Sequence, residues 1–306
     1  MTRNVAERRA GGAPRFIDPT VLARIDNLEL LARTVVDGFV AGLHRSPHLG
    51  LSLDFAEHRA YMPGDDIRMI DWSLFARSDR FYVKQFEAET NANVVIALDV
   101  SASMGFGTGT VTKLDYGRFL AAALAFLSGR QRDRIGMVTF DSQPRQTIPP
   151  SVRHVDRVLH TLDGLEPDGE GDLVSSLVRV GDGLKRRGIF VLISDLYADP
   201  QRLSEVLVPL RFRGQDVIVF HLLDEVELDL SLLGESAMFR DSETGETIPV
   251  VPAQAREEYT DRIQNHVSEL ERKLTGGRVD YALLDTSKPL DYGLFRYLSM
   301  REAVKR

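Results

Sequence analysis

Four apolar runs, each ending in an aspartate, constrain the fold of this chain more than any other feature of its 306 residues. They are Val94–Asp99, Ile135–Asp141, Gly188–Asp195 and Val217–Asp224, with helical periodicity between them. Runs rich in β-branched and aliphatic residues suit strands that are covered on both faces. Their alternation with helices predicts an α/β fold with a doubly wound, mostly parallel sheet of the Rossmann type. His221, inside the fourth run, is expected to be a hydrogen-bonded core residue.

The first run continues into two serines, in the order Asp99-Val100-Ser101-Ala102-Ser103. In an extended segment alternate side chains point the same way, so the carboxylate and both hydroxyls can converge. Such hard oxygen ligands suit Mg²⁺ or Mn²⁺ and do not suit zinc or copper. Doubly wound sheets bind ligands at the carboxyl ends of strands, beside the topological switch point, where we expect Asp99 and Asp195. The alternative is a strand-end turn whose serines satisfy backbone groups.

Composition and charge exclude several classes of function. A net charge of −7 argues against nucleic-acid binding, which normally needs a basic surface. Without cysteine the chain has no disulfides or thiolate chemistry, which fits a cytoplasmic location. The longest apolar stretch, residues 119–127, is about half of what a bilayer crossing needs, so no membrane span is expected.

The periodicity divides the chain into three parts. Residues 1–17 contain several arginines with no apolar segment behind them, which indicates a flexible tail and not a signal peptide. Residues 18–90 form an extension, with a helix from Asp18 to about Phe39 and a strand near 80–86. Residues 91–302 form the sheet domain, with a short edge strand near 146–148 and a β-hairpin insertion near 225–252 that has Gly245 at a left-handed position.

The pattern of Asp99, Ser101 and Ser103 resembles the DxSxS motif of the metal-ion-dependent adhesion site in von Willebrand factor A domains. A longer and more specific string is Phe55–Trp72, followed by Ala76-Arg77 and by Val83–Glu87. It resembles a bacterial family of unknown function that has a von Willebrand A-like domain. Genes of that family usually neighbour those of MoxR-type AAA+ ATPases. The resemblance covers roughly residues 45 to 302.

The resemblance implies a metal site formed by Asp99, Ser101, Ser103 and Asp195. Both serines would bind Mg²⁺ or Mn²⁺ directly and both aspartates largely through waters, which leaves one position for a partner's carboxylate. The family pattern adds a threonine from a GGTDL-like string, which here reads Gly169-Glu170-Gly171-Asp172-Leu173. Gly171 stands at the threonine position, so the site is partly degenerate and binding is expected to be weak. A water or Glu170 could fill the gap, and Asp172 is expected to cap the next helix.

Several residues of the long string, all but one of them charged, are a second candidate set. Either they form ion pairs that tie the extension to the sheet domain, or they form a partner-docking surface. The pair Asp65 and Asp66 could be a further acidic site, and the alternative is a Pro-Gly turn, an N-cap and a short helix leading to Trp72. The set comprises Arg59, Asp65, Asp66, Arg68, Asp71, Trp72 and Arg77.

These observations favour a non-enzymatic protein-interaction module. The family association implies that it works with a MoxR-type AAA+ ATPase on a client protein offering a carboxylate, in the assembly or remodelling of a complex. A Mg²⁺-dependent hydrolase and a metal-free scaffold with a decayed site are the alternatives. The sequence has no Gly-Lys-Ser/Thr phosphate loop and no GxSxG elbow, and the predicted metal loops contain no histidine or lysine except Lys113.

Overall fold

The computed structural model describes residues 18–45, 57–61, 74–75, 80–85, 92–241 and 245–304. Two compact units divide these residues: 37–45 belong with 57–85, and 18–36 belong with 92–304. Residues 18–36 therefore lie in the same unit as the sheet. The sequence instead predicts that they belong to an extension that runs from residue 18 to residue 90.

A six-stranded sheet is the centre of the second unit, in the order β10-β7-β6-β3-β4-β5. The edge strand β5 runs antiparallel to β4, and all other neighbours are parallel. This arrangement confirms the predicted doubly wound, mostly parallel sheet. The strands are β3 (Asn93–Asp99), β4 (Arg134–Phe140), β5 (Pro144–Ser151), β6 (Gly188–Ser194), β7 (Gln215–Leu223) and β10 (Asp280–Asp285).

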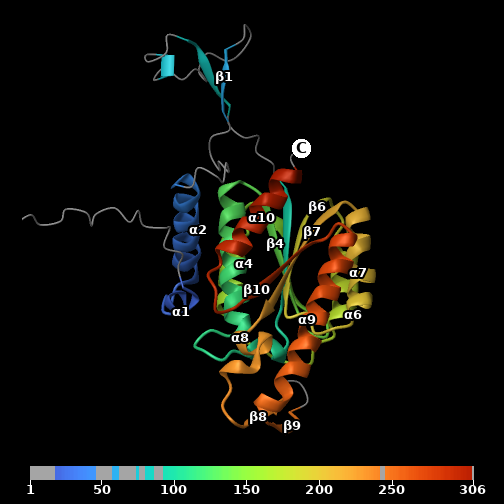
Figure 1. Cartoon of the computed structure of the whole chain (residues 1–306). Coiled ribbons are helices and arrows are strands. Elements are labelled where there is room, and N and C mark those ends of the chain that lie inside the picture. The colour runs from blue at the N-terminus through green and yellow to red at the C-terminus, as the bar shows by residue number, and fades with distance from the viewer. Residues whose placement is uncertain are drawn as a thin grey trace, which may run out of the picture. The chain divides into compact units, whose positions relative to one another are not determined.

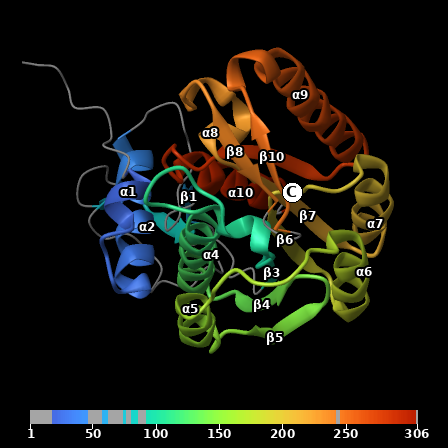
Figure 2. The same ribbon diagram turned by 90° about the horizontal axis from the view of Figure 1, so that it is seen from below.

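Helices cover both faces of the sheet, as Figures 1 and 2 show. One face carries α4 (Lys113–Arg130), α5 (Val155–Asp163) and α10 (Asp291–Val304). The other carries α6 (Leu173–Gly183), α7 (Pro200–Phe212) and α9 (Pro252–Gly276). Because both faces are covered, the central strands β3, β4, β6 and β7 are mostly apolar and buried along nearly their whole length, whereas the edge strand β5 is largely exposed.

The core has one layer on each face of the sheet. Under α6, α7 and α9, the inward residues of the strands pack with Leu177, Leu207 and Leu274. On the other face, α4 is buried over most of its surface and lies very close to the sheet. A Cβ added at Gly117 would lie 3.0 Å from Leu98 Cδ1, which leaves little room for a larger residue. This close packing holds the first turn of α4 against the carboxyl ends of the central strands.

The single helix predicted from Asp18 to about Phe39 is wrong. The chain forms α1 (Pro19–Leu22) and α2 (Leu28–Arg45), with a non-helical segment between them. The Asn27 side chain accepts a 2.9 Å hydrogen bond from the backbone N–H of Leu30, as an N-cap does, so the helix begins anew there. Apolar spacing alone missed this capping signal.

Strand β5 is longer than the edge segment near residues 146–148 suggested by the sequence, and it includes Pro144, Pro149 and Pro150. An edge strand tolerates proline because the missing N–H can be on the side without a neighbour.

Two short pairs of strands lie outside the main sheet. In the first unit, β1 (Glu57–Ala60) pairs antiparallel with β2 (Tyr82–Gln85), which confirms the strand near 80–86.

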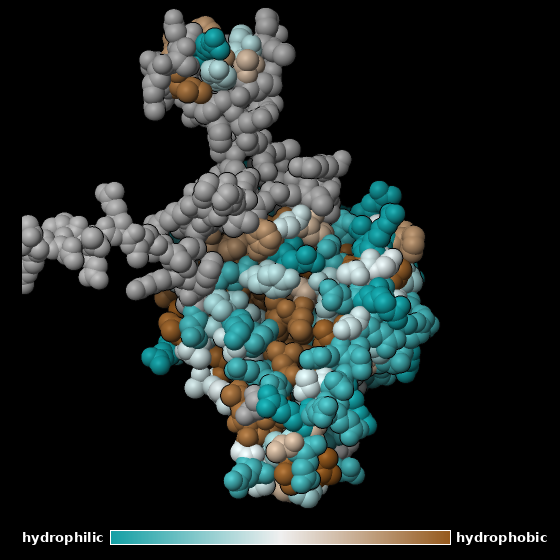
Figure 3. Space-filling model, viewed as in Figure 1, coloured by the Kyte–Doolittle hydropathy of each residue, from teal (hydrophilic) through white to brown (hydrophobic). Residues whose placement is uncertain are grey.

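The other pair is the predicted hairpin insertion, formed by β8 (Ala237–Arg240) and β9 (Thr247–Val250). Gly245 has a φ of +74°, as expected for a left-handed turn position. Met238 and Ile248 are well exposed on it, and Figure 3 shows apolar side chains at this end of the molecule. Across the described ranges, none of the helices combines the length and the apolar character needed to cross a membrane.

Candidate functional site

The two central strands define the topological switch point. From β3 the chain continues to β4 and β5 on one side, and it then returns to form β6, β7 and β10 on the other side. Strands β3 and β6 are parallel neighbours, so their carboxyl ends meet. Asp99 ends β3 and Asp195 directly follows β6. The tertiary structure therefore brings the two predicted acidic residues to the position where such sheets bind ligands.

Asp99 is buried and organises the two serines that follow it. One carboxylate oxygen accepts hydrogen bonds from the Ser101 backbone N–H at 3.0 Å and from the Ser101 hydroxyl at 2.7 Å. The Ser101 and Ser103 hydroxyl oxygens are 3.2 Å apart. Adjacent ligands of an octahedral Mg²⁺, with bonds of about 2.1 Å, lie about 3 Å apart. The serine pair therefore fits two neighbouring positions around such an ion.

A matched turn shows what the motif does elsewhere in this chain. At the end of β10, Asp285 accepts hydrogen bonds from the Ser287 backbone N–H at 2.8 Å and from the Ser287 hydroxyl at 2.7 Å. This is the same local geometry as in Asp99 and Ser101, on an exposed turn. The aspartate–serine turn is thus ordinary by itself, and its position beside Ser103 and Asp195 is what distinguishes the first copy.

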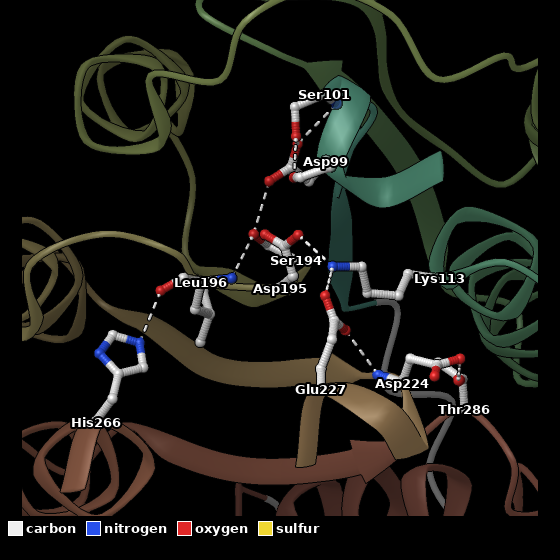
Figure 4. Close-up of polar contacts among 11 residues, drawn as sticks. Asp99, Ser101, Lys113, Ser194, Asp195, Leu196, Asp224, Glu227, His266 and Thr286 are labelled. Atoms are coloured by element: carbon white, nitrogen blue, oxygen red, sulfur yellow. Dashed lines mark hydrogen bonds and ion pairs between the residues drawn. The ribbon is translucent and has the colours of Figure 1, made fainter. Parts of the chain in front are cut away.

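A lysine that sequence reasoning did not place in the site contacts Asp195. Lys113 is the first residue of α4, and its Nζ lies 2.8 Å from Asp195 Oδ2 and 2.6 Å from Glu227 Oε1 (Figure 4). Its side chain is 1% exposed. The other oxygen of Glu227 accepts the Asp224 backbone N–H at 2.8 Å, within the capping box of α8 (Glu225–Leu228). Glu227 is therefore held in position to share the ammonium group.

Burial and charge shift the ionisation of this cluster. Burial, together with the negative charge of Asp195, raises the pKa of Asp99 to about 7, although hydrogen bonds from Ser194 and Ser101 partly offset the rise. Burial lowers the pKa of Lys113, but the two carboxylates outweigh this effect and the net pKa is raised. Lys113 is therefore a cation that balances Asp195 and Glu227 in a poorly solvated place.

The loop before α6 lies against the serine segment. The Ala102 N–H donates to the Gly169 carbonyl at 3.0 Å, and the Asp168 N–H donates to the Val100 carbonyl at 2.9 Å. Gly169 has a φ of +82°, and an added Cβ would lie 2.9 Å from Asp141 Oδ2. These contacts support the expectation that the 169–173 string borders the site.

Two further residues of that string were singled out in the sequence. Glu170 is exposed in the loop. Asp172 accepts the Ser175 backbone N–H at 3.1 Å and caps α6, which confirms the role expected of it. Gly171, at the family's threonine position, lies between them.

The donor set is one of hydroxyls and carboxylates. Within the described part of the chain, no three His, Cys, Asp or Glu side chains gather where they could hold a metal ion. A divalent ion at the switch point would therefore depend on Ser101, Ser103 and water as well as on the aspartates. Such a set suits a hard ion that retains several waters.

The sequence placed Lys113 near the predicted metal loops without a role, and it did not indicate Ser194 or Glu227 as site residues. Ser194 directly precedes Asp195, and Glu227 stands three residues after Asp224, a spacing typical of a capping box. No local sequence signal connects Lys113 with Asp195 or Glu227.

In the second candidate set, Arg59 lies on β1 opposite Val83. The remaining members, Asp65, Asp66, Arg68, Asp71, Trp72 and Arg77, lie outside the described residues.

The sequence has relatives whose function is also open. A family described as "Protein of unknown function DUF58" matches residues 57–269. The uncharacterized proteins Mb1516 of Mycobacterium bovis and Rv1480 of Mycobacterium tuberculosis are each 27% identical over 291 residues, covering 93% of this chain and 90% of the relative.

Several solved structures are similar to this chain at low sequence identity. The conserved hypothetical protein BatB from Bacteroides thetaiotaomicron is 18% identical with a TM-score of 0.48, covering 69% of this chain and 99% of the other. A von Willebrand factor type A protein from Catenulispora acidiphila is 14% identical with a TM-score of 0.40, covering 71% of this chain and 43% of the other. The SpRpn10 VWA domain is 11% identical with a TM-score of 0.37, covering 66% and 92%.

Proposed function

This chain belongs to the DUF58 family of proteins of unknown function, and from that premise we propose that it is a non-enzymatic interaction module whose switch point takes up a divalent cation. The observation that carries the proposal is the convergence of Ser101 and Ser103, with hydroxyls 3.2 Å apart, beside Asp99 and Asp195. A bound Mg²⁺ or Mn²⁺ would supply a Lewis-acidic position for a partner's carboxylate.

The residues of this chain have distinct parts in the proposal. Ser101 and Ser103 would hold the ion directly, and Asp99 and Asp195 would hold it largely through water. Asp99 orients the Ser101 hydroxyl by accepting its hydrogen bond, and it is itself held by the Ser194 hydroxyl at 2.7 Å. Ser103 is half-buried, so the serine pair borders solvent on one side. A carboxylate from another protein would approach from there.

The resemblance to a family encoded beside MoxR-type AAA+ ATPases suggests the partner. We expect such an ATPase to bind this module while the metal position engages a client protein during assembly or remodelling of a complex. The chain contains no cysteine and so needs no oxidising compartment for disulfide formation. We propose that the interaction takes place in the cytoplasm.

A hydrolase is less well supported by the same residues. Hydrolysis at a metal ion needs a nearby base or nucleophile that is free to act. Lys113 and Glu227 lie beside Asp195 and are engaged with each other in an ion pair. A metal-free scaffold remains the competing proposal, and the ion pair of Lys113 with Asp195 favours it.

Metal binding is tested by calorimetric titration of the full chain with Mn²⁺ and Mg²⁺. We expect one weak divalent site that is lost in Asp99→Ala and Ser101→Ala. The matched controls are Asp285→Ala and Ser287→Ala, which disrupt the same turn on β10 and should leave binding unchanged. Identical titrations for wild type and Asp99→Ala would rule out this site.

The partnership is tested by reciprocal capture with a MoxR-type ATPase from the same organism. Capture is expected with nucleotide present. If a metal bridges the contact, capture should also be weaker after chelation and in Ser101→Ala. Failure to recover the ATPase under any nucleotide condition would contradict the partnership and leave the metal test unaffected.

A further inference from the structure

Lys113 contacts one oxygen of Asp195, a carboxylate that the proposed divalent site also uses. Its ammonium nitrogen is 2.8 Å from Asp195 Oδ2, within direct hydrogen-bond distance. Taking the proposed function as its basis, we propose that Lys113 is the resident cation of the site and competes with a divalent ion for Asp195. Metal binding then requires the ammonium group to move away from Asp195.

The competition follows from charge and solvent access. Both partners of the ion pair are almost fully buried, with side chains 1% and 4% exposed. Two cations in such a place repel each other strongly because little water screens them. A divalent ion held near Asp195, even through water, is therefore disfavoured while Lys113 stays in contact with the same carboxylate. The weak binding expected for the site has a second cause here, independent of Gly171.

Glu227 offers the ammonium group an alternative position. It lies 2.6 Å from Nζ and is itself fixed by the Asp224 backbone N–H. The backbone of Lys113 is fixed too, because Thr112 and Asp115 form the capping box at the start of α4. Only the side chain can move, and it can leave Asp195 without losing a carboxylate partner. Figure 4 shows Lys113 extending between the two acids.

Two aromatic rings border the buried ammonium group. Nζ lies 5.7 Å from the ring centre of Phe106 and 5.1 Å from that of Tyr197. Both residues are partly exposed, at 37% and 49%. Such rings stabilise a nearby cation and keep it within the site as it moves. Lys113 can therefore shift toward Glu227 and the rings while it stays in place as a charge.

The experiment compares divalent affinity in variants that remove or keep the charge. Mn²⁺ and Mg²⁺ are titrated into wild type, Lys113→Met, Lys113→Arg and the surface control Lys288→Met, whose side chain is 65% exposed. We expect Lys113→Met to bind at least about tenfold more tightly, since it removes the competing charge. Lys113→Arg and Lys288→Met should remain close to wild type.

Substitution of Glu227 provides a second test, in which the expected change in divalent affinity is opposite to that of Lys113→Met. Glu227→Gln leaves Asp195 as the sole carboxylate for the ammonium, so divalent binding should weaken. If Glu227 acts through Lys113, this effect should largely disappear when Glu227→Gln is combined with Lys113→Met. An effect of Glu227→Gln that is equal in both backgrounds would overturn its role as the alternative position.

Lys113→Met leaves two buried acids without a cation and can lower stability. The thermal midpoint is therefore measured with EDTA and with Mn²⁺, for Lys113→Met and for Lys113→Gln. A larger metal-induced rise than in wild type supports the proposal, including a variant that folds only with metal. A neutral variant that gains no more from Mn²⁺ than wild type overturns it.

The outcomes separate this proposal from the proposed function. Equal, measurable affinity in wild type and Lys113→Met overturns the competition and keeps the metal site. Binding in Lys113→Met without detectable binding in wild type supports the competition, and it means that the native site needs a displacing partner. No binding in either protein overturns both the competition and the metal-bridged function.

Discussion

The Ser194 hydroxyl donates a 2.7 Å hydrogen bond to Asp99 and so joins the carboxyl ends of the two central strands. The same oxygen accepts the backbone N–H of Leu196 at 3.1 Å. Leu196 is fully buried and has a φ of +52°, a conformation that is costly for a leucine. One serine thus supports both the carboxylate of the site and a strained residue in the loop that carries Asp195.

Ser194→Ala should lower the free energy of unfolding by about 1–3 kcal/mol, because it leaves a buried carboxylate oxygen and a buried N–H without their partner. Urea denaturation measures the change. Ser287→Ala removes a similar serine–aspartate bond at an exposed turn and should change stability by less than about 0.5 kcal/mol. Equal losses in the two variants would contradict the role assigned to Ser194.

His221 should make stability depend on pH. It is fully buried, its Nδ1 lies 2.7 Å from the Tyr281 hydroxyl, and burial lowers its pKa to about 3. The unfolded chain, with a histidine pKa near 6.5, binds the proton more readily. The contribution of His221 to stability is therefore present above about pH 6.5 and is lost as the pH falls toward 3.

His221→Gln removes this titration. The difference in unfolding free energy between wild type and His221→Gln should therefore fall as the pH drops from 7 to 4, with a slope approaching about 1.4 kcal/mol per pH unit. Urea denaturation across that range provides the measurement, and His160→Gln on the exposed side of α5 is the control. A difference that does not change with pH would show that His221 is not held neutral.

Gly171→Thr should tighten divalent binding by about 1 kcal/mol, because a hydroxyl would replace a coordinated water. The contacts of Gly169 and Asp168 with the segment after β3 place this loop beside the serines. Titration with Mn²⁺ measures the gain, and circular dichroism confirms that the variant is folded. Unchanged affinity in a folded variant would mean that residue 171 does not reach the ion.

The loop itself offers the control for that substitution. At Gly164 an added Cβ would meet nothing within 4 Å, so Gly164→Thr should alter neither folding nor metal affinity. Gly169→Thr is unsuitable because the positive φ of Gly169 disfavours any side chain.

Several features of the fold could be predicted because their causes are local. Apolar runs long enough for buried strands indicated β3, β4, β6 and β7, and Gly245 indicated the turn of the hairpin. The failures also have local causes. The N-cap at Asn27 divides a stretch whose apolar spacing is continuous, and an edge position allows the prolines of β5.

The amino-acid sequence by itself determined that Asp99 and Asp195 would meet, since the carboxyl ends of parallel strands lie at one edge of a sheet. It could not determine that Lys113 would join them. Lys113 is 82 residues from Asp195 and 114 from Glu227, and no spacing rule connects positions so far apart. The tertiary structure decided that contact. The packing of α4 on the sheet places the ammonium group beside Asp195, and the capping box of α8 holds Glu227 against the same group.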